Sequence, residues 1–143
     1  MYHVLMAVDG DEERLSHQLD AVERLPGRDE ITVTVLYVHE VVDTPADEAG
    51  KRIIDAINED IDDLQGLPDG VSRAREALAD SGFQVAVSTG TGDPADVILE
   101  VAANADVDVV QLAGRKRSPI GKAVFGSVTQ RVILESDRPV TVA

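Results

Sequence analysis

Short runs of apolar and β-branched residues alternate along the chain with segments in which apolar residues recur at helical spacing. A short apolar run bounded by turn residues is typical of a buried strand, and β-branched residues favour that conformation. Five such runs predict five strands: Tyr2–Val8, Ile31–Val38, Phe83–Ser88, Val107–Ala113 and Val140–Val142. The segment Thr89–Gly92, which follows the third run and contains two glycines, is interpreted as a loop.

Helices are predicted between these strands. The first follows Asp9 and Gly10 and has acidic residues in its first turn, and its apolar stripe recurs every three or four positions: Leu15, Leu19, Val22 and Leu25. Residues 44–66 predict a polar helix with a stripe of isoleucines. Residues 71–80 predict a second helix, which ends near Gly82.

The two later helices have clear start signals. Asp93 and Pro94 supply an N-cap and a first helical residue for a helix with an apolar face of Ala95, Ile98, Val101, Ala102 and Ala105. Gly126 and Ser127 open the last helix, and Pro139 ends it. Three of its residues are expected to face inward: Val128, Val132 and Ile133.

The alternation of strands with helices predicts an α/β fold with a parallel sheet and right-handed crossovers. Five strands suit a doubly wound sheet, and no linker or internal repeat divides the chain, so residues 1–143 are interpreted as one domain. Ligands of such sheets bind beyond the carboxyl ends of the strands, where the strand order switches. The candidate site therefore comprises the strand ends Val8–Asp9, Val38–His39, Thr89–Gly92 and Ala113–Gly114.

Composition narrows the class of partner. The chain carries 27 acidic and 13 basic residues, and its formal net charge of -14 argues against nucleic acids and anionic membranes as partners. It has no cysteine, no apolar run long enough to span a membrane and no basic-plus-apolar leader, so a cytoplasmic location is expected. The excess of carboxylates favours a halophilic protein, adapted to high salt, over an ordinary acidic one.

The charge is uneven along the sequence. Residues 115–143 contain six basic and two acidic residues, and the basic run Arg115–Arg117 directly follows a predicted strand. Gly126 and Ser127, at a helix start, offer backbone N–H groups and the positive end of the helix dipole to phosphate. The basic segment 115–143 predicts a site for a small phosphorylated ligand, and a solvated basic surface is the alternative.

The order of these pieces resembles the universal stress protein family over essentially the whole chain. The matching pieces are the strand that ends at Asp9-Gly10, the helix start Gly92–Ala95, the strand Val109–Gly114 and, most specifically, Phe125–Thr129 followed by Pro139-Val140. The resemblance implies a five-stranded parallel sheet of order 3-2-1-4-5 with helices on both faces, similar to the adenine nucleotide alpha hydrolase fold. It also implies a homodimer. One branch of the family binds ATP and another does not.

The glycine loop bears on the choice between these branches. The ATP-binding branch has G-x-x-G, nine residues and then G-[ST], whereas this chain has Gly114 with two residues after it, nine more residues and then Gly126-Ser127. The missing second glycine favours a dimeric protein–protein interaction module without nucleotide. The cations Lys116 and Arg117 suit a polyphosphate and favour ATP or a related adenine nucleotide as a regulatory ligand.

The resemblance and the basic loop together give a candidate binding set: Val8, Asp9, Val38, Ala113, Gly114, Lys116, Arg117, Gly126, Ser127 and Val128. The resemblance implies that Asp9 meets the ribose or a Mg²⁺ ion, Val38 the adenine and Gly114 the ribose-phosphate. It also implies that Gly126, Ser127 and Val128 hold phosphate. A helix N-cap is the alternative role of Asp9. No catalytic residue is assigned. Weak nucleotide hydrolysis would need a base and metal ligands, and Asp9 is the one candidate for these roles.

The last predicted strand is expected at the edge of the sheet. An exposed apolar edge invites pairing with another strand. We therefore expect a homodimer in which two copies of Val140–Val142 pair in antiparallel fashion, in line with the usual family dimer.

Overall fold

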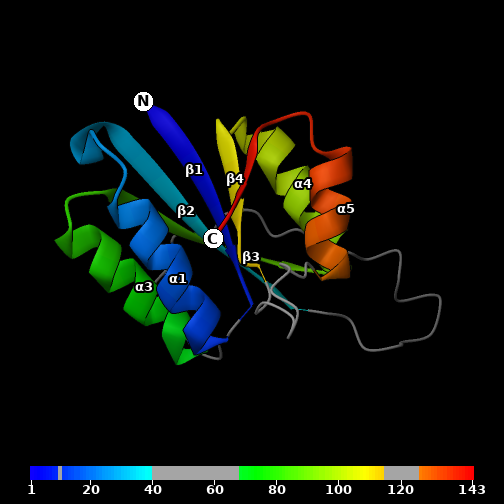
Figure 1. The fold of residues 1–143 in the computed structure, drawn as a ribbon, viewed down its shortest axis with the longest axis horizontal. Helices are drawn as coiled ribbons and strands as arrows, with labels where there is room; N and C mark the ends of the chain where they lie inside the picture. The colour runs from blue at the N-terminus through cyan, green and yellow to red at the C-terminus, as the bar shows by residue number, and fades with distance from the viewer. Residues whose placement is uncertain (10, 40–67, 115–125) are drawn as a thin grey trace, which may run out of the picture.

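A computed structural model describes residues 1–9, 11–39, 68–114 and 126–143. Five parallel strands form one sheet in the order β3-β2-β1-β4-β5, which confirms the expected order (Figure 1). The strands are β1 (Tyr2–Val8), β2 (Ile31–His39), β3 (Gln84–Thr91), β4 (Val109–Leu112) and β5 (Val140–Val142). β1 is central, because Val4 pairs with Val33 of β2 on one side and with Val109 of β4 on the other.

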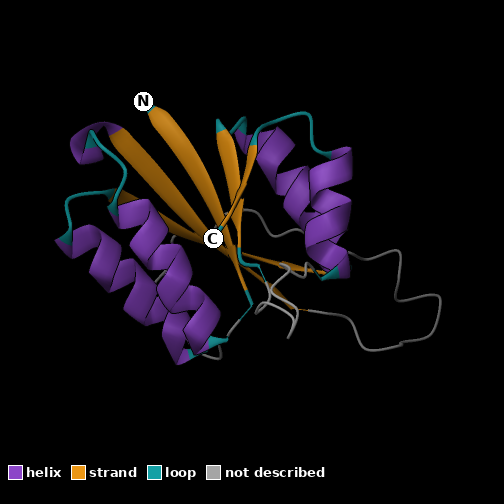
Figure 2. Ribbon diagram, in the orientation of Figure 1, coloured by secondary structure: helices purple, strands orange, loops and turns teal. Residues whose placement is uncertain are grey.

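Helices cover both faces of the sheet, as expected (Figure 2). They are α1 (Glu12–Glu23), α3 (Asp69–Asp80), α4 (Pro94–Ala105) and α5 (Ser127–Glu135), with a short 3-10 helix, η1 (Arg28–Glu30). α1 and α3 lie together on one face, and α4 and α5 lie together on the other. The predicted polar helix at 44–66 lies outside the described residues.

Side chains of each strand alternate between two cores, since successive strand residues point to opposite faces. Val4, Met6 and Val33 pack with α1 and α3, whereas Leu5, Leu36 and Val110 pack with α4 and α5. All six are at most 1% exposed. Burial of one such side chain contributes about 1.5–3 kcal/mol to the free energy of unfolding, so both faces anchor helices firmly to the sheet.

Aspartate side chains cap two of the helices. The predicted N-cap Asp93 is confirmed, because its carboxylate accepts the N–H of Asp96 at 3.1 Å and Pro94 begins α4. The N-cap of α1 is Asp11, whose carboxylate accepts the N–H of Arg14 at 3.0 Å. The alternative role of Asp9 as the helix cap is therefore wrong, and this carboxylate stays at the end of β1.

Two predicted strand boundaries are wrong. The third strand continues through Thr89 and Gly90 to Thr91, because the glycine packs beneath α4 and the ladder with β2 continues to His39. The fourth strand is shorter than predicted, since Val107 and Asp108 connect α4 to the sheet. The N–H of Asp108 donates to the carbonyl of His3 at 2.8 Å before the β4 ladder begins.

One predicted core position on α5 is also wrong. Ile133 is 40% exposed, whereas Val132 is fully buried and Thr129 is buried one turn earlier. Thr129 and Val132, three residues apart, therefore form the inward face of this short helix. Ile133 lies about 100° further round the helix and points away from that face. Leu134, beyond it, is 82% exposed. In the described part of the chain, no helix is long and apolar enough to cross a membrane.

Two glutamines link α1 to the centre of the sheet. The Gln18 amide donates to the Ala7 carbonyl at 2.8 Å and to the Gln111 side-chain oxygen at 3.3 Å. The Gln111 amide donates back to the Gln18 carbonyl at 3.0 Å. Both side chains are at most 3% exposed. Because buried polar groups are costly without partners, this pair fixes α1 over the boundary between β1 and β4.

Candidate functional site

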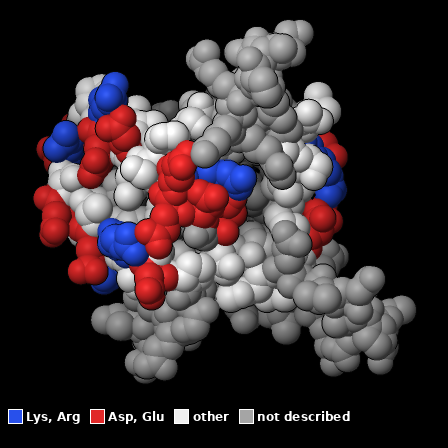
Figure 3. Space-filling view, turned by 60° about the horizontal axis from the view of Figure 1, so that its bottom comes forward, with Lys and Arg blue, Asp and Glu red and all other residues white. Residues whose placement is uncertain are grey.

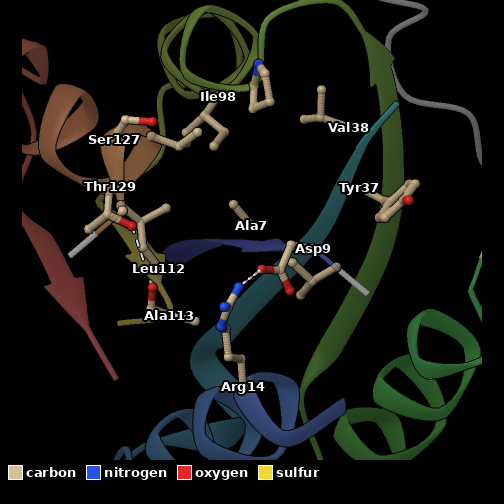
Figure 4. A pocket seen from close by; sticks show the side chains of 14 residues that line it. Ala7, Asp9, Arg14, Tyr37, Val38, Ile98, Leu112, Ala113, Ser127 and Thr129 are labelled. Carbon is tan, nitrogen blue, oxygen red and sulfur yellow. Dashed lines mark hydrogen bonds and ion pairs between the residues drawn. The ribbon is translucent and has the colours of Figure 1, made fainter. Parts of the chain in front are cut away.

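A cavity of about 510 Å³ opens at the carboxyl ends of β1, β2 and β4 (Figure 4). The starts of α4 and α5 form its opposite wall. Its lining residues come from all five elements and from α1: Ala7, Val8, Asp9, Arg14, Tyr37, Val38, Pro94, Ile98, Leu112, Ala113, Gly126, Ser127, Val128 and Thr129. β1 and β4 are the neighbours at which the strand order switches, so the cavity lies where a doubly wound sheet binds ligands.

The fold brings together seven members of the sequence-based binding set around this cavity: Val8, Asp9, Val38, Ala113, Gly126, Ser127 and Val128. Gly114 is described but does not line the cavity, and its N–H donates to the Ala143 carbonyl at 2.9 Å. The loop residues Lys116 and Arg117 lie outside the described residues.

Sequence reasoning missed half of the lining residues: Ala7, Arg14, Tyr37, Pro94, Ile98, Leu112 and Thr129. Tyr37 and Leu112 directly precede predicted strand-end residues, so a wider window at each strand end would have included them. Pro94 and Ile98 lie on the first turns of a helix that starts beside the sheet edge. Arg14 had no such signal, because it lies in a polar first turn among acidic neighbours.

The polar side of the cavity is an ion pair. The Arg14 guanidinium, on α1, reaches up to the Asp9 carboxylate at the end of β1 (Figure 4). The second carboxylate oxygen of Asp9 accepts the N–H of Asp11 at 3.0 Å. Both oxygens of Asp9 therefore have N–H donors, and both charged side chains are partly exposed, at 34% for Arg14 and 49% for Asp9.

The start of α5 forms another side of the cavity. Gly126 is the N-cap in an extended conformation, and no side chain of the described residues caps this helix. No acidic residue lies in its first turn, in contrast to α1, α3 and α4. The first N–H groups of a helix have no partner within it and carry the positive end of the dipole. Gly126–Thr129 lines the cavity, so an anion in this part of the cavity would lie at the positive end of the helix dipole.

The remaining wall of the cavity is largely apolar. Val38 and Ile98 face it from β2 and α4, and Leu112 from β4 (Figure 4). Tyr37 lies beside Val38, and its ring makes an edge contact with the His39 ring at a centroid distance of 4.9 Å. An apolar wall opposite an uncapped helix start suits a ligand with a flat, weakly polar part and an anionic part.

An arginine on α5 fixes the two helices that form the opposite wall. Arg131 donates to the Asp93 carboxylate at 2.8 Å, to the Asp96 carboxylate and to the Glu135 carboxylate at 3.0 Å. These hydrogen bonds, first that to Glu135 and then that to Asp96, raise the pKa of the guanidinium above its ordinary value. One cation therefore holds the start of α4 to the middle of α5.

The surface around the cavity is acidic. Figure 3, in which the lower side of Figure 1 comes forward, shows carboxylates outnumbering basic groups among the described residues. The start of α1 alone contributes Asp11, Glu12 and Glu13 next to Arg14. Within the described ranges, no cluster of three His, Cys, Asp or Glu residues is arranged to hold a metal ion.

Comparison with protein families decides which group of proteins this is. The model described as "Universal stress protein family" matches residues 1–143. The chain belongs to the universal stress protein family. Universal stress protein YxiE of Bacillus subtilis is 28% identical over 145 residues, covering 97% of this chain and 96% of that protein. Stress response protein NhaX of the same organism is 24% identical over 165 residues, covering 99% of each.

Solved structures of the family have the same fold. A universal stress protein from Archaeoglobus fulgidus superposes with a TM-score of 0.71 at 22% identity, covering 99% of this chain and 98% of that one. The Archaeoglobus protein in complex with dAMP gives 0.62 at 20% identity, covering 99% and 97%. An Arabidopsis thaliana family protein with AMP bound gives 0.64 at 16% identity, covering 99% and 90%.

Proposed function

We propose that this chain binds an adenine nucleotide as a regulatory ligand in the cavity at the carboxyl ends of β1 and β4. The observation that carries the proposal is the uncapped start of α5, which faces the same cavity as the apolar wall of Val38 and Ile98. The helix start suits a phosphate, and the apolar wall suits the base. Asp9 lies at the cavity edge, where a ribose hydroxyl can donate to its carboxylate.

The comparisons support the choice of an adenine nucleotide over other phosphorylated ligands. Family structures of the same fold are described in complex with dAMP and with AMP. These relatives are too distant for residue roles to be transferred, so the assignment of Val38 to the base and Ser127 to phosphate is our own. A volume of about 510 Å³ is in the range of small-molecule sites.

Calorimetry with AMP, ATP and adenosine at high salt tests this function. The variant Ser127→Asp places a carboxylate at the first position of α5, where it stabilises the helix and repels phosphate. We expect this variant to fold normally and to bind AMP about tenfold more weakly or worse. The matched control is Ser16→Asp, which adds the same charge at an exposed position of α1 outside the cavity lining. No heat from AMP or ATP with the wild-type chain would refute the proposal.

A second proposal is a homodimer through β5, which also serves the alternative function of a protein–protein interaction module without nucleotide. β5 lies at the end of the sheet order, and Thr141 at its centre is exposed. Antiparallel pairing about a two-fold axis at Thr141 places this residue opposite its own copy. Thr141→Lys brings two like charges together and should give a monomer in sedimentation, whereas Thr141→Val should leave the dimer intact. A dimer that binds no nucleotide would favour the alternative function.

We also propose that the chain works in the cytoplasm of an organism with high internal salt. The net charge of -14 is the supporting observation, because dense hydrated carboxylates keep a chain soluble when salt screens their repulsion. Circular dichroism as a function of KCl tests this proposal. Loss of the folded signal at low salt and its recovery at high salt are expected, and a melting temperature independent of salt would contradict it.

A further inference from the structure

Asp9 is the position at which the family resemblance implies a ribose or a Mg²⁺ ion, and the structure allows the metal to be tested. Mg²⁺ is held in proteins by one or two carboxylates in near-ideal octahedral geometry, with phosphates and water completing the shell. Among the described lining residues of the cavity, Asp9 is the only carboxylate. Its two oxygens already accept N–H groups from Arg14 and Asp11.

The Arg14 guanidinium makes this carboxylate a poor ligand for a second cation. Arg14 neutralises the charge that would attract Mg²⁺, and a divalent ion on the same oxygens would lie next to a like charge. No cluster of three metal-ligating side chains exists elsewhere in the described part of the chain. The residues present therefore do not fit a protein-bound Mg²⁺ at Asp9.

We propose that Arg14 takes the place of the divalent cation, so that this chain binds the nucleotide phosphate without metal. This inference rests on the proposed function and adds a specificity residue to the same site. A guanidinium has five N–H donors, and the described residues use one of those of Arg14, at Asp9. Because Arg14 lines the cavity, its other donors can bind the phosphate of a ligand there.

The charge of the surroundings explains why a cation is needed at this position. Asp9 places a carboxylate in the lining itself, and Arg14 is the one basic residue among the described lining residues. If Arg14 were neutral, an anionic ligand would meet the Asp9 carboxylate with no cation among the described lining residues to offset it. The loss should therefore grow with the charge of the ligand, from adenosine through AMP to ATP.

The test is calorimetry with adenosine, AMP and ATP, each in excess EDTA and in millimolar Mg²⁺, on the wild-type chain and three variants. Arg14→Gln removes the charge, Arg14→Lys keeps it as a point charge, and Arg24→Gln is the matched control. Arg24 is an exposed arginine of the same helix region that pairs with Asp20 and does not line the cavity. Circular dichroism verifies that every variant is folded.

The wild-type chain should bind AMP with the same affinity, within about twofold, in EDTA and in Mg²⁺. Arg14→Gln should weaken AMP binding about tenfold or more, and ATP binding further, while adenosine affinity stays within about twofold. Arg14→Lys should bind with intermediate affinity, and Arg24→Gln should match the wild type. In Arg14→Gln the Asp9 carboxylate no longer pairs with a guanidinium, so it can bind Mg²⁺ together with the phosphate. Mg²⁺ should therefore partly restore nucleotide binding to this variant.

Two results would overturn the inference while leaving the proposed function intact. One is nucleotide binding by the wild-type chain that disappears in EDTA. The other is an Arg14→Gln variant that binds AMP as tightly as the wild type or loses adenosine to the same extent as AMP. Failure of the wild-type chain to bind any nucleotide, with or without Mg²⁺, would instead overturn the proposed function and the inference with it.

Discussion

Gly90 sets how closely α4 approaches the sheet, and a single methyl group tests that contact. Gly90 is buried in β3, where it pairs with Val38 of β2. A Cβ atom added at Gly90 would lie 2.6 Å from Cγ1 of Val97 on α4. Val97 is 2% exposed and β-branched, so it has essentially one rotamer in a helix and cannot turn aside. The variant Gly90→Ala therefore forces α4 away from the sheet.

The expected cost follows from overpacking of a rigid core. Gly90→Ala should lower the free energy of unfolding by about 1–3 kcal/mol. Val97→Ala removes the obstructing methyl groups and alone should cost about 2–3 kcal/mol through the cavity that it leaves. In the double variant the new methyl occupies part of that cavity. The loss of unfolding free energy in the double variant should therefore be smaller than the sum of the two single losses by about 1 kcal/mol or more.

Gly70 provides the matched control for this substitution. A Cβ atom there would lie 2.8 Å from Cδ2 of Leu15, which is the far end of a flexible side chain. Gly70 also lies within α3, where alanine is favoured over glycine by about 0.5–1 kcal/mol. Gly70→Ala should therefore change the free energy of unfolding by less than about 1 kcal/mol. The two Gly→Ala variants differ in the stiffness of the neighbour that they meet.

Urea unfolding at one fixed salt concentration measures the free energies of unfolding of the wild type and the four variants. Guanidinium chloride is avoided because it would itself screen the charge of the chain. The reasoning would be refuted if Gly90→Ala were as stable as the wild type. It would also fail if the effects of Gly90→Ala and Val97→Ala added without coupling. A larger loss for Gly70→Ala than for Gly90→Ala would show that the stiffness of Val97 is not the cause.

Three further predictions concern charge. Burial holds the pKa of the His3 imidazole below its ordinary value of 6.5, despite the opposing effect of Asp108, so the unfolded chain binds the proton more readily. As pH falls through 6.5, the free energy of unfolding in urea should decrease more for the wild type than for His3→Gln. This variant keeps a hydrogen-bonding group near Thr34. Parallel pH profiles of the two proteins would contradict the prediction. Arg131→Gln should lower the urea midpoint because it removes the ion pairs that hold α4 to α5, and the effect should be smaller at high KCl. An effect no larger than that of Arg24→Gln would show that these ion pairs do not stabilise the contact between the two helices. The wild-type melting temperature should rise between about 0.1 M and about 2 M KCl, as differential scanning fluorimetry can show.

The strands were accessible from sequence because parallel strands are nearly continuous apolar runs. Their order in the sheet followed from the family resemblance, and the structure confirms it. The boundaries that failed are those set by tertiary contacts. The end of β3 depends on Gly90, which looks like a turn residue until α4 is packed against it. The start of β4 depends on hydrogen bonds between His3 and Asp108, which are far apart in the sequence.

The candidate site was predictable to the extent that it consists of strand ends and a helix start. The cavity lining at Asp9, Ala113 and Ser127 follows from the rule for doubly wound sheets. The role of Arg14 did not follow, since periodicity does not tell which of several charged residues in a first turn reaches the sheet edge. Likewise, Gln18 lies near an apolar stripe, and its partner Gln111 is known only from the fold.

The most direct test of the central claim is a titration of the ¹⁵N-labelled wild-type chain with AMP, followed by amide chemical shifts. Binding of phosphate at the start of α5 should move the N–H signals of Ser127, Val128 and Thr129 most, in a saturable manner. The base should also move signals at Tyr37 and Val38. The absence of saturable shifts, or shifts confined to residues outside the cavity, would contradict the assignment of this cavity as a nucleotide site.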